Sequence, residues 1–367
     1  MSEAKLFTPL TAGAIEMKNR VVMAPLTRNR ARHEDDAPHD LNVEYYRQRA
    51  GAGLIVTEAS QISPEGKGYA FTPGMFSDAQ VEGWKKITDA VHEKGGKIVV
   101  QLWHVGRISH TSLQPEGQAP VSAGSARAEG VQTFDGQQMV DVSTPRALGT
   151  DEIARVIEDY RASARAAQRA GFDGVEVHGA NGYLIDQFLR ETVNDRTDAY
   201  GGSVNNRARL LFEVLDAVTE IWGADRTGLR LSPFSPANGL DIGDAQATFE
   251  HVVAGLNRYG LSYLHVVEGA TGGPRDLPAG CSLDALRNAF DGVWIGNNGY
   301  DRDLAIDRVD SGAVDAVAFG RAYIANPDLA ERLAADAPLN EPNPSTFYGG
   351  GVEGYTDYPA LGNSRAA

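Results

Sequence analysis

Short apolar segments alternate with longer amphipathic segments along most of this 367-residue chain. The apolar segments are continuous and rich in β-branched residues, which is typical of parallel strands buried on both faces. Helical patterns follow several of them, as at residues 78–94, 150–170 and 243–259. Eight strands are expected, at residues 20–25, 53–57, 97–103, 174–178, 227–232, 261–267, 292–296 and 313–319. Eight strand-helix units predict a (β/α)8 TIM barrel.

Two segments fall outside this repeat. Residues 105–148, after the third strand, are rich in Gly, Ser, Gln and Pro and contain short strand-like pieces. We expect them to form an inserted hairpin excursion over the mouth of the barrel. The first 19 residues precede the first strand and are expected to plug the barrel floor. Residues 1–367 are predicted to form a single TIM-barrel domain.

A doubly wound dinucleotide-binding fold is the main alternative for an alternating strand-helix pattern. That fold carries a G-x-G-x-x-G sequence between a strand and a helix. No such sequence lies between a predicted strand and a predicted helix, and there is no Walker A sequence. Any nicotinamide cofactor is therefore expected to bind in another way.

Composition narrows the class of partner. The net charge of −15 argues against binding to nucleic acids or anionic membranes, both of which need basic patches. Cys281 is the only cysteine, so no disulfide can form within the chain. The sequence shows neither a signal-peptide pattern nor an apolar run long enough to span a bilayer. We expect a cytoplasmic protein that acts on small molecules.

Candidate catalytic groups are densest directly after the fourth strand. His178, Asn181 and Tyr183 place an imidazole, an amide and a phenol within six residues. The carboxyl ends of the strands form the active face of a TIM barrel, so these groups should meet residues from other strand ends. The other strand-end candidates are Thr27, Ala59, Gln101, Trp103 and Arg230.

The last two strands are followed by candidate phosphate-binding loops. Gly296, Asn297, Asn298 and Gly299 follow the seventh strand, and Gly320 and Arg321 follow the eighth. TIM barrels commonly bind phosphate here, where glycines expose backbone N–H groups and an arginine adds a bidentate contact. Arg230 lies within an apolar strand, so it needs either an internal carboxylate or a bound anion as its partner.

Two other reactions common in TIM barrels, metal-dependent hydrolysis and Schiff-base aldol chemistry, make different demands on the residues at the strand ends. His104, His178 and His265 lie near strand ends, so a metal-dependent TIM-barrel hydrolase is an alternative, weakened because no His-x-His pair occurs. Glu176, two residues before His178, belongs to the same pattern. A Schiff-base aldolase is disfavoured, because the last lysine, Lys97, begins the third strand at the wrong end of the barrel.

Several longer motifs together resemble the old yellow enzyme family of FMN-dependent ene-reductases. The resemblance runs over nearly the whole chain and is greatest to the bacterial branch of N-ethylmaleimide, pentaerythritol tetranitrate and morphinone reductases. The matching segments are Met23-Ala24-Pro25-Leu26-Thr27-Arg28, Gln101-Leu102-Trp103-His104-Val105-Gly106-Arg107, His178-Gly179-Ala180-Asn181-Gly182-Tyr183-Leu184, residues 195–203, Ala318-Phe319-Gly320-Arg321 and residues 346–351.

The resemblance implies a tightly but non-covalently bound FMN, with NADH or NADPH as transient electron donor. Thr27 would contact the flavin near its C4 carbonyl, Gln101 would hold the pyrimidine edge, and Arg230 would face N1 and the C2 carbonyl, stabilising the reduced flavin. The remaining implied contacts are Ala24, Pro25 and Ala59 to the ring, and Asn298, Gly299, Gly320 and Arg321 around the phosphate.

The resemblance also implies roles at the turn after the fourth strand. His178 and Asn181 would donate hydrogen bonds to the carbonyl or nitro oxygen of the substrate, and Tyr183 would protonate the α-carbon. Some relatives carry histidine where this chain has Asn181. The implied walls of the substrate pocket are Trp103, Tyr69 and Tyr348.

The expected activity is ping-pong reduction of activated C=C bonds. The substrates would be α,β-unsaturated carbonyls, maleimides and nitroalkenes, and by extension nitrate esters. A non-catalytic flavin-binding protein is a further alternative, which reduction of an alkene by the flavoprotein would exclude.

Overall fold

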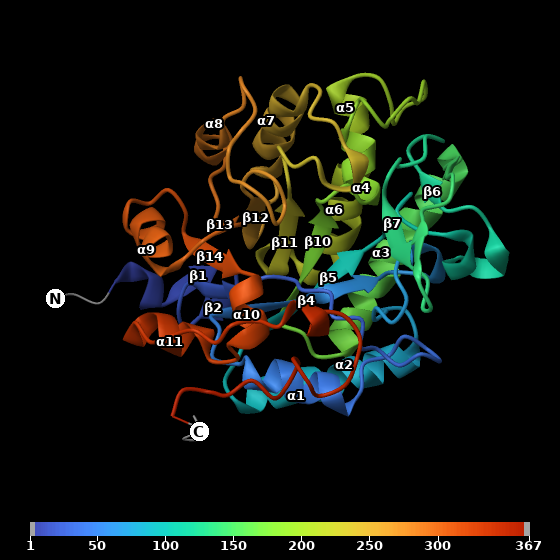
Figure 1. Cartoon of the computed structure of the whole chain (residues 1–367). Coiled ribbons are helices and arrows are strands. Elements are labelled where there is room, and N and C mark those ends of the chain that lie inside the picture. The colour runs from blue at the N-terminus through green and yellow to red at the C-terminus, as the bar shows by residue number, and fades with distance from the viewer. Residues whose placement is uncertain (1–3, 363–367) are drawn as a thin grey trace.

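The computed structural model describes residues 4–362 and shows eight parallel strands closed into a barrel (Figure 1). The order around the ring is β10-β11-β12-β13-β14-β3-β4-β5. Their bounds are β3 (Val21–Met23), β4 (Leu54–Gln61), β5 (Ile98–Trp103), β10 (Gly174–Gly179), β11 (Thr227–Leu231), β12 (Tyr263–Val267), β13 (Trp294–Asn297) and β14 (Ala316–Phe319). The predicted TIM barrel is confirmed, and every strand overlaps the segment expected for it.

The parallel register sets which side chains share a level in the barrel. His178 of β10 pairs with Arg230 of β11, and Arg230 pairs with His265 of β12. On the other side of β10, Glu176 pairs with Gln101 of β5. Because parallel strands end at one rim, polar side chains from four strands are brought together at the carboxyl end of the barrel.

Helices surround the barrel (Figure 1). The helices predicted at residues 78–94, 150–170 and 243–259 correspond to α2, α3 and α7. No helix within residues 4–362 is long and apolar enough to cross a membrane. The helix bounds are α1 (Asp40–Gln48), α2 (Asp78–Glu93), α3 (Thr150–Arg169), α4 (Leu184–Leu189), α5 (Val204–Arg207), α6 (Arg209–Trp222), α7 (Ala245–Leu256), α8 (Leu283–Asn288), α9 (Arg302–Asp310), α10 (Arg321–Ala325) and α11 (Leu329–Ala335).

The N-terminal segment closes the floor of the barrel, as predicted. Strands β1 (Leu10–Ala12) and β2 (Ile15–Met17) form an antiparallel hairpin. The hairpin is tied to the amino end of β12, since the Ser262 hydroxyl donates to the Ala12 carbonyl at 2.7 Å. Ala12, Ile15 and Met17 are buried in one apolar cluster with barrel residues such as Val22, Leu54, Val99 and Ile295. The plug therefore completes the core of the barrel.

The excursion after β5 folds as predicted into an inserted hairpin. Strands β7 (Gln132–Phe134) and β8 (Met139–Asp141) pair antiparallel, and β6 (Val121–Ser122) pairs in parallel with β9 (Arg146–Ala147). The backbone N–H of Ala70 donates to the Phe134 carbonyl at 2.9 Å, which fixes the β7/β8 hairpin to the loop after β4. The hairpin thus lies beside the strand ends where the site is expected.

Strand β4 is longer than its apolar pattern indicates. Residues 53–57 were expected, but the strand runs from Leu54 to Gln61, with an irregular register between Val56 and Ala59. Its second half is fully buried although it contains polar residues, including Glu58. The Glu58 carboxylate accepts hydrogen bonds from the Arg28 backbone N–H at 3.3 Å and from the Tyr46 hydroxyl at 3.2 Å. These buried partners, Tyr46 and Arg28, lie 12 and 30 positions from Glu58 in the sequence, outside the strand itself.

The segment after α11 returns across α1 to the barrel mouth, a course that the sequence did not predict. In Figure 1 it is the red trace that passes α1. The Arg28 guanidinium donates to the carbonyls of Phe347 at 2.7 Å and Gly354 at 2.9 Å. The ring of Tyr355 stacks on Tyr45 with 4.1 Å between centroids. These contacts place Tyr348 at the site.

Replacing Ile15 with alanine should lower the free energy of unfolding by about 2 to 5 kcal/mol, because the barrel floor would lose a buried side chain and retain a cavity. Urea denaturation followed by circular dichroism would measure this. Glu16→Ala, at an exposed position of the same strand, is the matched control. Equal midpoints for the two variants would contradict the assignment of the hairpin to the core.

Candidate active site

Two adjoining cavities lie at the carboxyl ends of the barrel strands. The inner cavity, of about 660 Å³, lies among the ends of β3, β11, β13 and β14. The outer cavity, of about 960 Å³, lies between residues 29–34, the β7/β8 hairpin and the returning C-terminal segment. Thr27 and Tyr348 line both cavities, so the cavities meet between these two residues.

Most residues predicted to hold a cofactor line the inner cavity. They are Ala24, Pro25, Thr27, Arg230, Asn298, Gly299, Gly320 and Arg321. Ala59 and Gln101 do not line it and are buried, with 4% and 1% of their surfaces exposed. The sequence therefore located the inner cavity, although two of the predicted contacts lie behind its surface.

Arg230 brings a buried positive charge to this cavity. Its Nη2 donates to Asn297 Oδ1 at 2.8 Å, and its Nε has no hydrogen-bond partner among residues 4–362. Burial lowers the pKa of Arg230, and the negative charge of Glu176 acts in the opposite direction. An arginine stays protonated even when buried, so the cavity contains a cation with a free donor. This fits the electron-rich pyrimidine edge of FMN.

Glu176 supports both of the polar residues beside it. Its carboxylate accepts from Gln101 Nε2 at 2.7 Å and from His265 Nδ1 at 2.9 Å. Burial alone would raise the pKa of Glu176, but His265, Arg230 and Gln101 together lower it. The carboxylate thus provides a negative charge on the strand beside Arg230, while the direct hydrogen-bond partner of Arg230 is Asn297. Because Nε2 of Gln101 is held by Glu176, its amide oxygen remains to accept a hydrogen bond.

The far end of the inner cavity has the polar loops that a phosphate group requires. Arg321 Nη2 donates to the Gly272 carbonyl at 3.0 Å, and Asn298 Nδ2 donates to the Ala270 carbonyl at 3.0 Å. Thr271, Gly272 and Gly273 also line this cavity, and the sequence reasoning missed them. The Thr-Gly-Gly sequence in the loop after β12 was the signal that could have found them.

His178 is buried under the aromatic residues of the site and is neutral. Its Nδ1 accepts a hydrogen bond from the Ala180 backbone N–H at 3.3 Å. Burial, reinforced by the positive charge of Arg230, lowers the pKa of His178 well below its ordinary value. The accepting Nδ1 assigns the proton to Nε2. His178 is therefore a neutral hydrogen-bond donor at Nε2.

Asn181 lies on the inner cavity in a left-handed turn. Its φ is +59°, a region that asparagine tolerates better than most residues, and Gly182 follows with φ +75°. A Cβ on Gly182 would lie 2.6 Å from the Ala237 carbonyl oxygen, so only glycine fits. The turn directs Asn181 and Tyr183 to different cavities.

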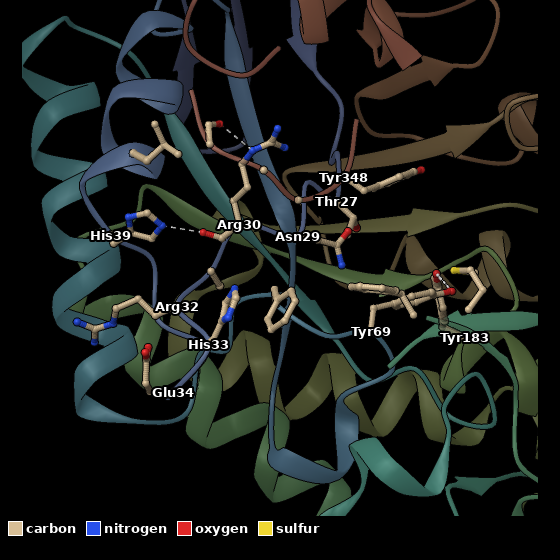
Figure 2. Close-up of a pocket in the computed structure, with 18 residues that line it drawn as sticks. Thr27, Asn29, Arg30, Arg32, His33, Glu34, His39, Tyr69, Tyr183 and Tyr348 are labelled. Carbon is tan, nitrogen blue, oxygen red and sulfur yellow. Dashed lines mark hydrogen bonds between the residues drawn. The ribbon is translucent and has the colours of Figure 1, made fainter. Parts of the chain in front are cut away.

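Tyr183 lies on the outer cavity among aromatic rings. Figure 2 shows Tyr69 and Tyr183 with their hydroxyls facing each other, 3.4 Å apart. The ring of Trp103 meets Tyr183 edge-on, with 4.9 Å between centroids, and the ring of His178 does so at 5.1 Å. Burial raises the pKa of Tyr183 above its ordinary value. The phenol is therefore protonated at neutral pH.

The predicted substrate walls separate into two groups. Tyr69 and Tyr348 line the outer cavity, whereas Trp103 is buried behind Tyr69 and stacks on it at 5.8 Å. The sequence reasoning missed other apolar walls of this cavity, namely Leu41, Phe71, Phe134 and Met139. Figure 2 shows the cavity running from Tyr69 and Tyr183 to His39, Arg32 and Glu34.

The histidines of the metal hypothesis do not come together as ligands. His104 Nδ1 accepts from the Gly106 backbone N–H at 3.1 Å, and His265 is bound to Glu176. No group of three or more His, Cys, Asp or Glu side chains in the described part of the chain is arranged to hold a metal ion.

The buried Arg230 and the polar loops after β12, β13 and β14 fit an anionic, phosphate-bearing cofactor in the inner cavity. The profile of the NADH:flavin oxidoreductase / NADH oxidase family matches residues 5–340. The chain belongs to this family and is an old yellow enzyme-type oxidoreductase that uses FMN. The predicted family and cofactor are confirmed, and the metal-dependent hydrolase is wrong.

Individual relatives match over nearly their whole length. The chain is 46% identical to the putative 12-oxophytodienoate reductase 11 of Oryza sativa subsp. japonica, covering 98% of each chain. It is 44% identical to the 12-oxophytodienoate reductase 2 of Arabidopsis thaliana, covering 97% of this chain and 96% of the relative.

Solved structures of similar proteins share the fold over nearly the whole chain. Morphinone reductase in complex with tetrahydroNAD has 51% identity and a TM-score of 0.93, covering 98% of each chain. The old yellow enzyme homologue of Zymomonas mobilis has 42% identity and a TM-score of 0.93, covering 97% of this chain and 99% of that one.

We expect the imidazole of His178 to remain neutral as the pH falls through about 6.5, where an unperturbed histidine titrates, because burial beside Arg230 disfavours the cation. Nuclear magnetic resonance of the ring, assigned by comparison with His178→Gln, would measure this. An inflection of that resonance near pH 6.5 would contradict the assignment.

Proposed function

We propose that the protein reduces activated C=C bonds of α,β-unsaturated carbonyl compounds, maleimides and nitroalkenes in a ping-pong cycle. FMN, when bound, supplies the hydride that it has taken from a nicotinamide to the β-carbon of the alkene. His178 and Asn181 would donate hydrogen bonds in the same way to the oxygens of a nitrate ester, which would make nitrate esters substrates as well. The proposal rests on the placement of the turn after β10. Asn181 lines the inner cavity, Tyr183 lines the adjoining outer cavity, and buried His178 lines neither but packs against the Tyr183 ring, with 5.1 Å between centroids.

His178 and Asn181 are proposed to hold the oxygen of the activating group. Negative charge grows on this oxygen as hydride reaches the β-carbon, so donors directed at it bind the transition state more tightly than the ground state. The neutral Nε2–H of His178 suits this role because it needs no proton transfer. Tyr183, protonated and facing the outer cavity, is proposed to protonate the α-carbon.

The nicotinamide donor has support among the relatives. Morphinone reductase, at 51% identity, binds tetrahydroNAD in its solved structure. We propose that a nicotinamide and the alkene bind in turn at the junction of the two cavities, between Thr27 and Tyr348. The plant relatives are 12-oxophytodienoate reductases, and an oxo-dienoate carries both a carbonyl group and C=C bonds, which supports this substrate class.

Replacing His178 and Asn181 together with alanine should slow alkene reduction by on the order of 100-fold or more, because the growing negative charge would lose its donors. Stopped-flow absorbance near about 450 nm, where oxidised flavin absorbs, would follow reoxidation of the NADH-reduced enzyme by 2-cyclohexenone. His251→Ala with Asn205→Ala, exposed positions of α7 and α5, is the matched control. Unchanged reoxidation with normal FMN content would remove the pair from the mechanism.

Tyr183→Phe should slow reduction of alkenes that need an enzymatic proton while leaving reduction of the flavin by nicotinamide nearly intact. The reason is that only the α-carbon step takes a proton from the phenol. Both half-reactions would be measured separately by stopped flow. Tyr69→Phe, which removes the neighbouring hydroxyl and keeps Tyr183, is the control. Equal losses in the two half-reactions would contradict the role of Tyr183.

A further inference from the structure

The side chain of Asn181 has a hydrogen-bond partner from a distant loop. Thr271 follows β12, and its Oγ1 lies 2.8 Å from Asn181 Oδ1. Both residues line the inner cavity. The contact therefore acts directly on the amide that the proposed function assigns to the substrate oxygen.

The protons of this contact can be placed by counting donors. Ser235 is fully buried, and its Oγ accepts from the backbone N–H of Thr271 at 3.0 Å and from that of Ala237 at 3.4 Å. Both acceptor positions of the Ser235 oxygen are thus occupied, so its own proton points to Thr271 Oγ1, 2.9 Å away. The single proton of Thr271 is then left to donate to Asn181 Oδ1.

The backbone of Asn181 is fixed independently of Thr271. Its N–H donates to Ser232 Oγ at 2.7 Å, and its carbonyl accepts from Asn238 Nδ2 at 2.8 Å. The remaining freedom is rotation of the side-chain amide, which exchanges Oδ1 and Nδ2. A hydroxyl that donates to Oδ1 favours one of these two orientations and leaves Nδ2 for the cavity.

We propose that Thr271 is a positioning residue that keeps the Asn181 amide turned with Nδ2 toward the inner cavity. Held in this way, Asn181 is a donor and selects substrates that present an acceptor oxygen, such as an enone carbonyl or a nitro group. In the reversed orientation Oδ1 would face that oxygen and repel it. The inference rests on the proposed role of Asn181, and it adds that the Thr271 hydroxyl decides whether the amide presents its donor or its acceptor to the cavity.

The loop that carries Thr271 is itself anchored to the polar end of the inner cavity. Its neighbour Ala270 accepts from Asn298, and Gly272 accepts from Arg321. Thr271 therefore joins the residues predicted around the phosphate to the residue predicted at the substrate. Its position depends on contacts on both sides and on buried Ser235 behind it.

Thr271→Val keeps the shape of the side chain and removes the hydroxyl. We expect kcat/KM for 2-cyclohexenone to fall roughly 2- to 10-fold, the range of one ordinary hydrogen bond. The inhibition constant of cyclohexanone, which presents the same carbonyl and cannot be reduced at a C=C bond, should rise by a similar factor. FMN content should be unchanged, and Thr271→Ser, which restores the hydroxyl, should restore both constants.

A double-mutant cycle with Asn181→Ala tests the inference separately from the proposed function. In the Asn181→Ala background, Thr271→Val should have no further effect, because the amide it orients is gone. An Asn181→Ala enzyme that retains full alkene reduction would overturn the proposed function of Asn181. A large effect of Asn181→Ala would support that function. The inference about Thr271 would then be overturned by wild-type constants in Thr271→Val or by failure of Thr271→Ser to restore them. It would also be overturned if Thr271→Val had the same effect in the Asn181→Ala background as in the wild type.

Discussion

The buried charge of Arg230 is the constraint on which the arrangement of the site depends. A guanidinium within an apolar strand is costly unless a partner lies at the same depth. The barrel provides Glu176 from the adjacent strand, and Asn297 takes one of its hydrogen bonds. Since Glu176 also holds Gln101 and His265, one carboxylate organises polar groups from four strands. The cation is thereby stabilised, while its Nε has no hydrogen-bond partner among residues 4–362.

The positive charge of Arg230 also lowers the pKa of His178 on the neighbouring strand. His178 lies beside Arg230 in the parallel register, and together with burial this proximity keeps the imidazole neutral. A neutral ring with Nδ1 occupied can donate only through Nε2. Under the proposed function, two adjacent residues on paired strands would therefore supply the cation for the cofactor and the neutral donor for the substrate.

The sequence predicted the features that depend on local patterns. Continuous apolar strands and amphipathic helices identified the barrel, and the strand-end rule and the family resemblance together named eight cofactor contacts that line the inner cavity. The end of β4 was missed because Glu58 and its polar neighbours are buried through Tyr46 and Arg28, which no local pattern reveals. The course of the C-terminal segment was missed for the same reason, since Arg28 and Phe347 are 319 positions apart. Thr271 belongs to this group, because its contact with Asn181 exists only after β10 and β12 have entered one barrel.

The turn after β10 explains why the cavities have different chemistry. Left-handed conformations at Asn181 and Gly182 reverse the chain within two residues, so that Asn181 lies on the inner cavity and Tyr183 on the outer one. Under the proposed function, this separation keeps the group that stabilises negative charge apart from the group that delivers the proton. An alkene bound at the junction would then meet the hydrogen-bond donor from one side and the proton donor from another. The left-handed turn makes this separation of Asn181 and Tyr183 possible.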